Sequence, residues 1–298
     1  MPIDMPFGTP FGMPFESLRV TVLGSGSGGN SILIEAEGTR ILVDAGLSAR
    51  ELARRMEAVS SVRLEDIHAV LVTHEHSDHV SGIPALASAG IPVHATTGTA
   101  RALGLTAARE LGPGEPFTIG ALCVNPVPVP HDASEPVGFV LTSGPNKVGI
   151  LTDCGFPDRT IAAAYAGCDV LVLETNHDSS MLRSGPYPPS LKRRIGGARG
   201  HLSNEQAADL LTLIVRADPL ERMPRVLVLA HLSQMNNRPR LARLAVERAL
   251  ARMGSRSPRP RIILSSQSRP SSPVRVTQGG LEILPQEDSR QLCLVFPD

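Results

Sequence analysis

The chain has 298 residues, of which 42% are hydrophobic, and its 29 basic and 29 acidic side chains cancel to a formal net charge of zero. This length allows one large domain with a sizeable core. Without net charge, no overall field draws the protein to nucleic acid or to an anionic membrane, so a local patch or a metal would have to hold any anionic partner. No apolar run is long enough to span a bilayer, and the N-terminus lacks the pattern of a signal peptide. We therefore expect a cytoplasmic protein with no membrane partner.

Apolar, β-rich runs alternate with helical patterns along the chain. Among the predicted elements, in chain order, are strand 18–24, helix 48–59, strand 67–73, helix 79–90, strand 91–96, strand 147–153, strand 168–175, helix 203–217, strand 225–230 and helix 240–253, with further short β-rich runs and one more helix between them and a last strand after them. Ser48 is a candidate helix N-cap, and Ser203 with Gln206 fits a capping box. Residues 176–202 are rich in Gly, Pro and Arg and are expected to be irregular. The alternation indicates an α/β protein with mixed sheets.

The strand at 67–73 leads directly into the heptapeptide THEHSDH. Alternate side chains of an extended chain point the same way, so His74 and His76 can reach one metal ion. Asp78 and His79 follow where the chain turns into a helix, and they suit a second ion. Imidazole and carboxylate groups are the ligands expected for zinc, manganese or iron.

Three further polar residues stand where apolar runs stop. His131 follows VNPVPVP, Asp153 ends KVGILTD and His231 follows RVLVLA. A sheet presents groups to a cleft at such places, although any one of these residues alone could equally be an ordinary loop side chain. Together with THEHSDH they favour a metal site.

The motif HxHxDH, with Gly82 three residues after its last histidine and the three later residues in order, resembles the metallo-β-lactamase superfamily. The resemblance covers residues 18–276, leaving a loose leader at 1–17 and an unassigned segment at 277–298. It implies a four-layer αβ/βα sandwich with two mixed β-sheets. It also implies the ligand sets: one ion held by His74, His76 and His131, a second by Asp78, His79 and His231, and Asp153 as the bridge between them.

Two adjacent cations lower the pKa of a shared water and stabilise developing negative charge, which predicts hydrolysis by a metal-bridged hydroxide. Asp78 is therefore counted as catalytic as well as a ligand. β-Lactamases of the common subclasses have a cysteine ligand where this chain has Asp153, and we expect the neighbouring Cys154 to point to the opposite face. Two oxygen-bridged ions suit phosphoester cleavage, with zinc or manganese as the expected metal and iron as a further candidate.

Longer stretches are similar to the YycJ/WalJ group of this superfamily: HDASEP (131–136), ETNHD (174–178), MLRSGPYPPSLKRRI (181–195), GHLSNEQAA (200–208) and AHLSQMNN (230–237). That group comprises single-domain bacterial relatives of the nucleases with this fold. It is associated with 5′-to-3′ DNA exonuclease activity and with a cell-envelope signalling system. The resemblance implies a nucleic-acid partner, DNA with a 5′ end.

Residues 181–200 contain five basic side chains and no acidic one, which favours a local anion site. Arg193 and Arg194 are expected to contact phosphates, although a solvated arginine-rich loop would have the same composition. His201 matches a histidine that related phosphodiesterases use beside the scissile phosphate, where it can donate a proton. His177 is expected to contact substrate or a ligand. The loop GSGSGGNS would border the site, so Asn30 or Ser27 could touch a terminal phosphate.

Our first hypothesis is a two-metal 5′-to-3′ DNA exonuclease. The alternative is a small-molecule hydrolase of a thioester, a lactone or a cyclic phosphodiester, since fold does not fix substrate. A third hypothesis is a regulator that binds a partner and whose metal site is structural. The sequence leaves open the choice of metal, DNA against RNA, the polarity and the oligomeric state.

Overall fold

The computed structural model describes residues 17–254, 258–277 and 280–284. The predicted leader therefore lies outside the described residues except for its last residue, and so does most of the segment after residue 276. The predicted domain begins at residue 18 and ends at residue 276, and these two limits stay predictions. One strand nevertheless lies beyond residue 276, in the segment for which the sequence predicted no structure, and it joins the first of two sheets.

The first sheet is formed by strands from both ends of the chain. Its strands are β1 (Leu18–Gly24), β2 (Ser31–Ala36), β3 (Thr39–Val43), β4 (Ala69–Leu71), β5 (Val93–Ala95), β6 (Arg109–Glu110), β14 (Val274–Val276) and β15 (Leu281–Ile283). Their order is β15–β14–β1–β2–β3–β4–β5–β6. The pairs from β3 to β6 are parallel and the others are antiparallel, so the sheet is mixed.

The second sheet repeats this plan. Its strands are β7 (Phe117–Ile119), β8 (Leu122–Pro128), β9 (Val137–Ser143), β10 (Asn146–Leu151), β11 (Val170–Glu174), β12 (Val226–Ala230) and β13 (Arg261–Leu264). Their order is β13–β12–β11–β10–β9–β8–β7, with parallel pairs from β10 to β13 and antiparallel pairs elsewhere.

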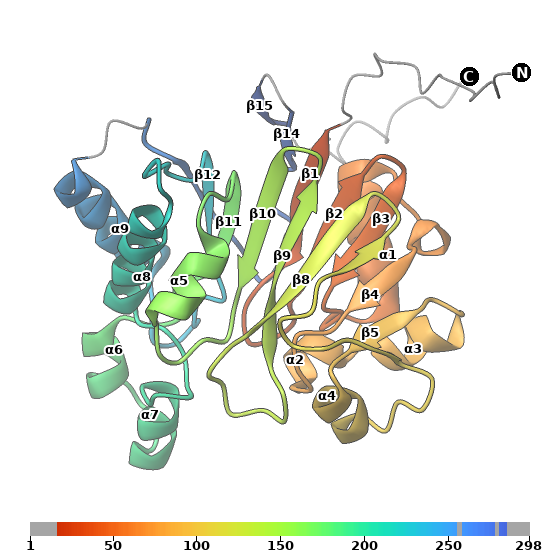
Figure 1. Cartoon of the computed structure of the whole chain (residues 1–298). Coiled ribbons are helices and arrows are strands. Elements are labelled where there is room, and N and C mark those ends of the chain that lie inside the picture. Colours follow the sequence, from red (N-terminus) through yellow and green to blue (C-terminus); the bar gives the residue numbers. More distant parts are fainter. Residues whose placement is uncertain (1–16, 255–257, 278–279, 285–298) are drawn as a thin grey trace, which may run out of the picture.

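Helices cover the outer face of each sheet, which gives four layers (Figure 1). The helices are α1 (Ala49–Ser60), α2 (Ser77–Val80), α3 (Ile83–Ser88), α4 (Thr97–Ala102), α5 (Arg159–Tyr165), α6 (Ser179–Ser184), α7 (Pro189–Ile195), α8 (Asn204–Ala217) and α9 (Pro239–Met253), with a 3₁₀ turn at Leu64–Asp66. Helices α1, α3 and α4 pack on the first sheet, and α5, α8 and α9 pack on the second. The predicted sandwich is confirmed.

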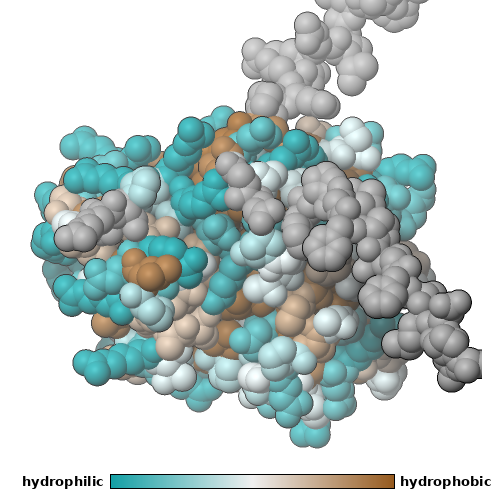
Figure 2. Space-filling view, turned by 45° about the horizontal axis from the view of Figure 1, so that its top comes forward, coloured by the Kyte–Doolittle hydropathy of each residue, from teal (hydrophilic) through white to brown (hydrophobic). Residues whose placement is uncertain are grey.

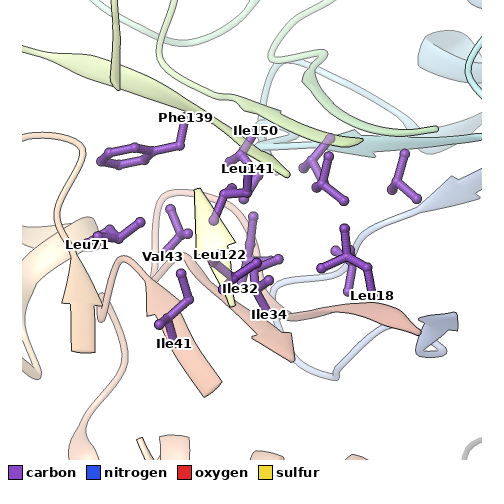
Figure 3. Packing of buried hydrophobic residues seen from close by; sticks show 14 of the residues in the cluster. Leu18, Ile32, Ile34, Ile41, Val43, Leu71, Leu122, Phe139, Leu141 and Ile150 are labelled. Carbon is purple, nitrogen blue, oxygen red and sulfur yellow. The ribbon is translucent and has the colours of Figure 1, made fainter. Parts of the chain in front are cut away.

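Three apolar clusters hold the layers together, one between the sheets and one under each helical layer. In the central cluster, Ile34 and Ile41 from the first sheet face Leu122 and Phe139 from the second (Figure 3). Every second residue of these strands points to this cluster, as the two-residue period of a strand requires. Burial of this apolar area is the main favourable term in forming the sandwich.

Figure 2, which brings the top of Figure 1 forward, shows a largely hydrophilic face on which apolar residues occur in small groups. Within the part of the chain that the structure describes, no helix combines the length and the apolarity needed to cross a membrane.

The helix N-caps that the sequence predicted are present in the structure. The Ser48 side chain accepts a hydrogen bond from the Glu51 amide, and Ser203 forms the predicted capping box with Gln206. The expectation that residues 176–202 are irregular is wrong, because α6 and α7 lie within this segment. Asp178 caps α6 by accepting from the Ser180 and Met181 amides, and Pro189 occupies the first position of α7, where its missing N–H is not needed.

The carboxyl ends of the parallel strands meet at one edge of the sandwich, the lower edge in Figure 1. Asp44, Asp153 and His231 follow β3, β10 and β12 there, and all three have left-handed backbones, with φ of 60°, 57° and 55°. Non-glycine residues adopt this conformation at an energetic cost, and such residues cluster at functional sites.

Two glycines let backbone segments cross closely at this edge. A Cβ atom on Gly46 would lie 1.7 Å from the Asp78 carbonyl oxygen and 2.7 Å from the Asn30 nitrogen. A Cβ atom on Gly82 would lie 2.4 Å from the Leu47 carbonyl oxygen. Gly82 is the glycine that follows the HxHxDH motif, and this close approach gives a physical reason for it.

We therefore predict that Gly46→Ala lowers the free energy of unfolding by about 1–3 kcal/mol, because the added methyl group forces backbone apart. Urea unfolding measures the effect. Gly196→Ala is the matched control, because a Cβ atom there would have its nearest neighbour at an ordinary 3.4 Å. Equal stability of the two variants would contradict the prediction.

Candidate metal centre

The structure brings all seven predicted metal ligands together. The donor atoms of His74, His76 and His131 lie within 4.8 Å of one another, and the same holds for those of Asp78, His79 and His231. Asp153 lies between the two groups. Its Oδ2 is 3.1 Å from His79 Nε2, and its Oδ1 is 3.8 Å from His131 Nε2. This proximity is what the two predicted ligand sets and their shared carboxylate require.

Hydrogen bonds behind the histidines orient the rings. The Nδ1–H groups of His131 and His79 donate to the Gly200 carbonyl at 3.0 Å and to Asp44 Oδ2 at 2.7 Å. The Nδ1–H group of His231 donates to Glu174 Oε1 at 3.0 Å. Each ring therefore turns its Nε2 toward the cluster, which is how neighbouring groups orient a metal-binding histidine.

Asp44 is a site residue that the sequence analysis missed. Its carboxylate accepts from the Thr73 amide at 2.8 Å, from the Thr73 hydroxyl at 2.9 Å and from His79. Thr73 Oγ1 in turn lies 2.9 Å from His74 Nδ1, so Asp44 orients one histidine directly and a second through Thr73. The available signal was the position of Asp44 at the end of the apolar run RILV, the same signal that identified Asp153.

Glu174 is a second missed residue, and it is fully buried at the end of β11. Its Oε1 accepts from His201 at 2.8 Å and from His231. Its Oε2 accepts from the amides of Cys154 and Leu202, each at 3.0 Å. One carboxylate therefore fixes a predicted ligand and the predicted catalytic histidine together.

The buried carboxylates of this cluster require positive charge. Burial alone would raise the pKa of Glu174, but the charge of His201 and the hydrogen bonds from both histidines lower it to about 2. The same balance, with His231 and His79 as the largest opposing charges, holds the pKa of Asp153 well below its usual range. In return, Asp153 raises the pKa of His231 to about 10 against the effect of burial. Protons or a metal cation can supply this charge.

The donor set fits divalent metal ions. His74 Nε2 is buried in the cluster and has no hydrogen-bond partner among the described residues. Burial lowers the pKa of His74, so its ring is neutral and keeps a lone pair available. Buried polar atoms without partners are rare, and convergent lone pairs of nitrogen and oxygen are what a cation such as zinc or manganese satisfies.

A pocket of 170 Å³ opens onto the cluster. Besides the cluster it is lined by other polar and apolar side chains, namely Ser27, Asn176, Tyr187, Arg194, Ile195, His201 and Ser233. Arg194 stands at its rim, with Nε 2.5 Å from Asp132 Oδ2. Of the predicted substrate and catalytic residues outside the ligand sets, the structure therefore places Arg194 and His201 at this pocket, together with Ser27.

The other three predicted substrate residues lie elsewhere. Asn30 is buried behind the cluster, where its amide donates to Asp78 Oδ2 at 3.2 Å and to backbone carbonyls. Arg193 and His177 line a different pocket on the far side of α7. Cys154 points away from the cluster, as expected: its sulfur lies against the Phe156 carbonyl, and burial raises the pKa of its thiol.

Comparison with known proteins agrees with this architecture. Residues 39–232 match the family described as a beta-lactamase superfamily domain. The chain is 35% identical to exodeoxyribonuclease YycJ of Bacillus anthracis, over 80% of this chain and 90% of that protein. It is 33% identical to exodeoxyribonuclease WalJ of Streptococcus pneumoniae D39, over 78% and 88%. Among solved structures, the metallo-β-lactamase fold protein YhfI of Bacillus subtilis matches with a TM-score of 0.64 and 17% identity, over 86% of this chain and 99% of that one, which shows a common fold.

We predict that Asp44→Asn weakens binding of zinc or manganese roughly 10- to 100-fold, because two histidines lose the group that orients them. Competition with a chromophoric chelator measures the affinity. Asp209→Asn, which changes an exposed carboxylate on α8, is the control and should bind metal as the unaltered protein does. Unchanged affinity in Asp44→Asn would show that Asp44 does not support the ligands.

Proposed function

The chain belongs to the metallo-β-lactamase superfamily and to the group of the YycJ and WalJ exodeoxyribonucleases within it, and from this membership we propose that it is a 5′-to-3′ DNA exonuclease. It is a metal-dependent hydrolase. The observation that carries the proposal is the juxtaposition, in one pocket, of the histidine–carboxylate cluster, His201 and Arg194. A cytoplasmic location, with access to DNA, is part of the proposal.

We assign one ion to His74, His76 and His131, a second to Asp78, His79 and His231, and Asp153 to both. Zinc and manganese suit these nitrogen and oxygen ligands, and iron is a further candidate. Two such ions supply Lewis acidity, which lowers the pKa of water and stabilises the charge that develops on a phosphate.

His201 is assigned the proton transfer. Its Nδ1–H donates to Glu174, which leaves Nε2 to face the pocket. Burial opposes protonation of His201, but the charge of Glu174 and this hydrogen bond raise its pKa. A protonated imidazole there can donate to the leaving 3′ oxygen as the phosphodiester bond breaks. Asp78 has no proton to offer, because hydrogen bonds from His231 and His79 lower its pKa against the effect of burial.

Arg194 is assigned to the substrate backbone. Its guanidinium lies at the rim of the pocket, paired with Asp132, and its side chain is 54% exposed. The pair aligns the planar group while leaving N–H donors for a phosphate. A contact of this kind positions a strand without reading its sequence.

DNA labelled at its 3′ end and phosphorylated at its 5′ end should be shortened from the 5′ end in manganese or zinc, releasing 5′-mononucleotides. His76→Ala should lose at least about a hundredfold in rate, because one ligand set is incomplete. RNA of the same sequence tests the choice of polymer. If neither polymer is cut while two metals remain bound, the nuclease proposal fails and small esters, lactones and cyclic phosphodiesters become the substrates to examine.

Arg194→Met should lower kcat/KM for DNA about tenfold or more and reduce the dependence of KM on salt, because one phosphate contact is lost. The small ester bis(p-nitrophenyl) phosphate, which lacks a neighbouring phosphate, should show a smaller loss. Equal kcat/KM for DNA in Arg194→Met and the unaltered protein would contradict the assignment of Arg194 to the DNA backbone.

A further inference from the structure

A second pocket, of 590 Å³, lies on the other side of α7 from the metal cluster. Helices α6 and α7 and the start of α8 enclose it, at the lower left of Figure 1. It is lined by His177, Ser179, Leu182, Arg183, Pro189, Lys192, Arg193, Gly196, Ser203 and Gln206. The pocket at the metal cluster has 170 Å³, below the roughly 300–1,000 Å³ usual for small-molecule sites, which suits a phosphate group better than a whole nucleotide.

Neighbouring residues of the same segments line the two pockets. After β11, Asn176 lines the metal pocket and His177 the second one. In α7, Arg194 lines the metal pocket and Arg193 the second one. The two pockets therefore lie on either side of these two segments, and a ligand long enough to cross between them would occupy both.

The lining of the second pocket suits a phosphorylated, partly apolar ligand. Arg183, Lys192 and Arg193 supply positive charge, and no acidic residue lines the pocket. Asp178 and Glu205 are nearby acids: Asp178 accepts from the Ser180 and Met181 amides, and the exposed Glu205 accepts a hydrogen bond from Ser179 at 3.0 Å. The 14-residue helix α8 begins at the pocket, so its N-terminal end adds a favourable field for an anion. Leu182 and Pro189 provide apolar contact.

His177 provides evidence for a ligand that is independent of the positive charge of the pocket. Its side chain is only 3% exposed, it lines the pocket, and its Nδ1 has no hydrogen-bond partner within the described residues. Lys192 and Arg183 are partly engaged, since Lys192 Nζ donates to the Arg183 carbonyl at 2.7 Å and Arg183 donates to Ser180 at 3.0 Å. A buried polar atom without a partner, in the wall of a pocket that three cations line, points to a ligand, and a phosphate suits that charge.

We propose that this pocket binds the 5′-terminal nucleotide of the DNA strand, with its 5′-phosphate against Arg193 and the start of α8, while the next phosphate along the strand enters the metal pocket. The inference rests on the proposed exonuclease function and deepens it. With the terminal nucleotide held beside the metal cluster, water adds to the following phosphate and the bond to the 3′ oxygen of the held nucleotide breaks. The products are one 5′-mononucleotide and a strand with a new 5′-phosphate, which is again a substrate.

The test compares two DNA strands that differ only in carrying a 5′-phosphate or a 5′-hydroxyl. The unaltered enzyme should prefer the phosphorylated strand by roughly tenfold or more in kcat/KM, as expected for charge-assisted hydrogen bonds to one group. Arg193→Met should lower this ratio to near one. Arg248→Met, an exposed arginine on α9, is the matched control and should keep the full ratio.

Two results would overturn the inference: no preference in the unaltered enzyme, or an equal loss on both strands in Arg193→Met, which would make Arg193 a general contact to DNA. If no DNA is cut at all, the exonuclease function fails, and binding tests the pocket separately. Equilibrium dialysis of the protein as purified should show that dAMP binds about tenfold tighter than deoxyadenosine, and that Arg193→Met removes the difference. Equal binding of the two compounds would reject the pocket as a phosphate site.

Discussion

Three carboxylates buried at the edge of two apolar sheets set the constraint that the rest of the site satisfies. Asp44, Asp153 and Glu174 are 4%, 2% and 0% exposed, and a buried charge is costly unless it is paired and hydrogen-bonded. Backbone amides and histidine N–H groups from separate segments of the chain converge on these carboxylates. The histidines they orient leave their remaining nitrogens facing one another, so compensating the carboxylates also creates the cation site.

The sheets make this arrangement possible because their parallel strands end at a common edge. The two halves are built alike, with β3 and β4 delivering Asp44, Thr73 and His74, and β10 to β12 delivering Asp153, Glu174 and His231. Large apolar clusters on both faces of each sheet fix the strands that carry these residues. Packing energy far from the site therefore supports unfavourable local features at the site, including buried charge and left-handed backbone.

The fold and the clustering of the seven candidate ligands could be predicted from the sequence, because His74, Asp153 and His231 stand where apolar strands end and the HxHxDH motif resembles a known superfamily. Asp44 and Glu174 stand at equally recognisable places, but nothing in a sequence tells which ring nitrogen a carboxylate will reach. The helices α6 and α7 escaped prediction because they are short and bounded by Pro and Gly, so neither has a full period of apolar residues. Because α7 was not predicted as a helix, the sequence could not show that Arg193 and Arg194 line different pockets on its two sides.

At Asp44 and Asp153 the backbone is left-handed, so a substitution can remove the negative charge without disturbing the backbone only if the new residue tolerates this conformation. Asparagine has nearly the same size as aspartate and tolerates this conformation, whereas a residue such as alanine adds about 1–2 kcal/mol of backbone strain to the loss of the carboxylate. Substitution by asparagine can therefore remove the negative charges of Asp44 and Asp153 while the main chain keeps the same path.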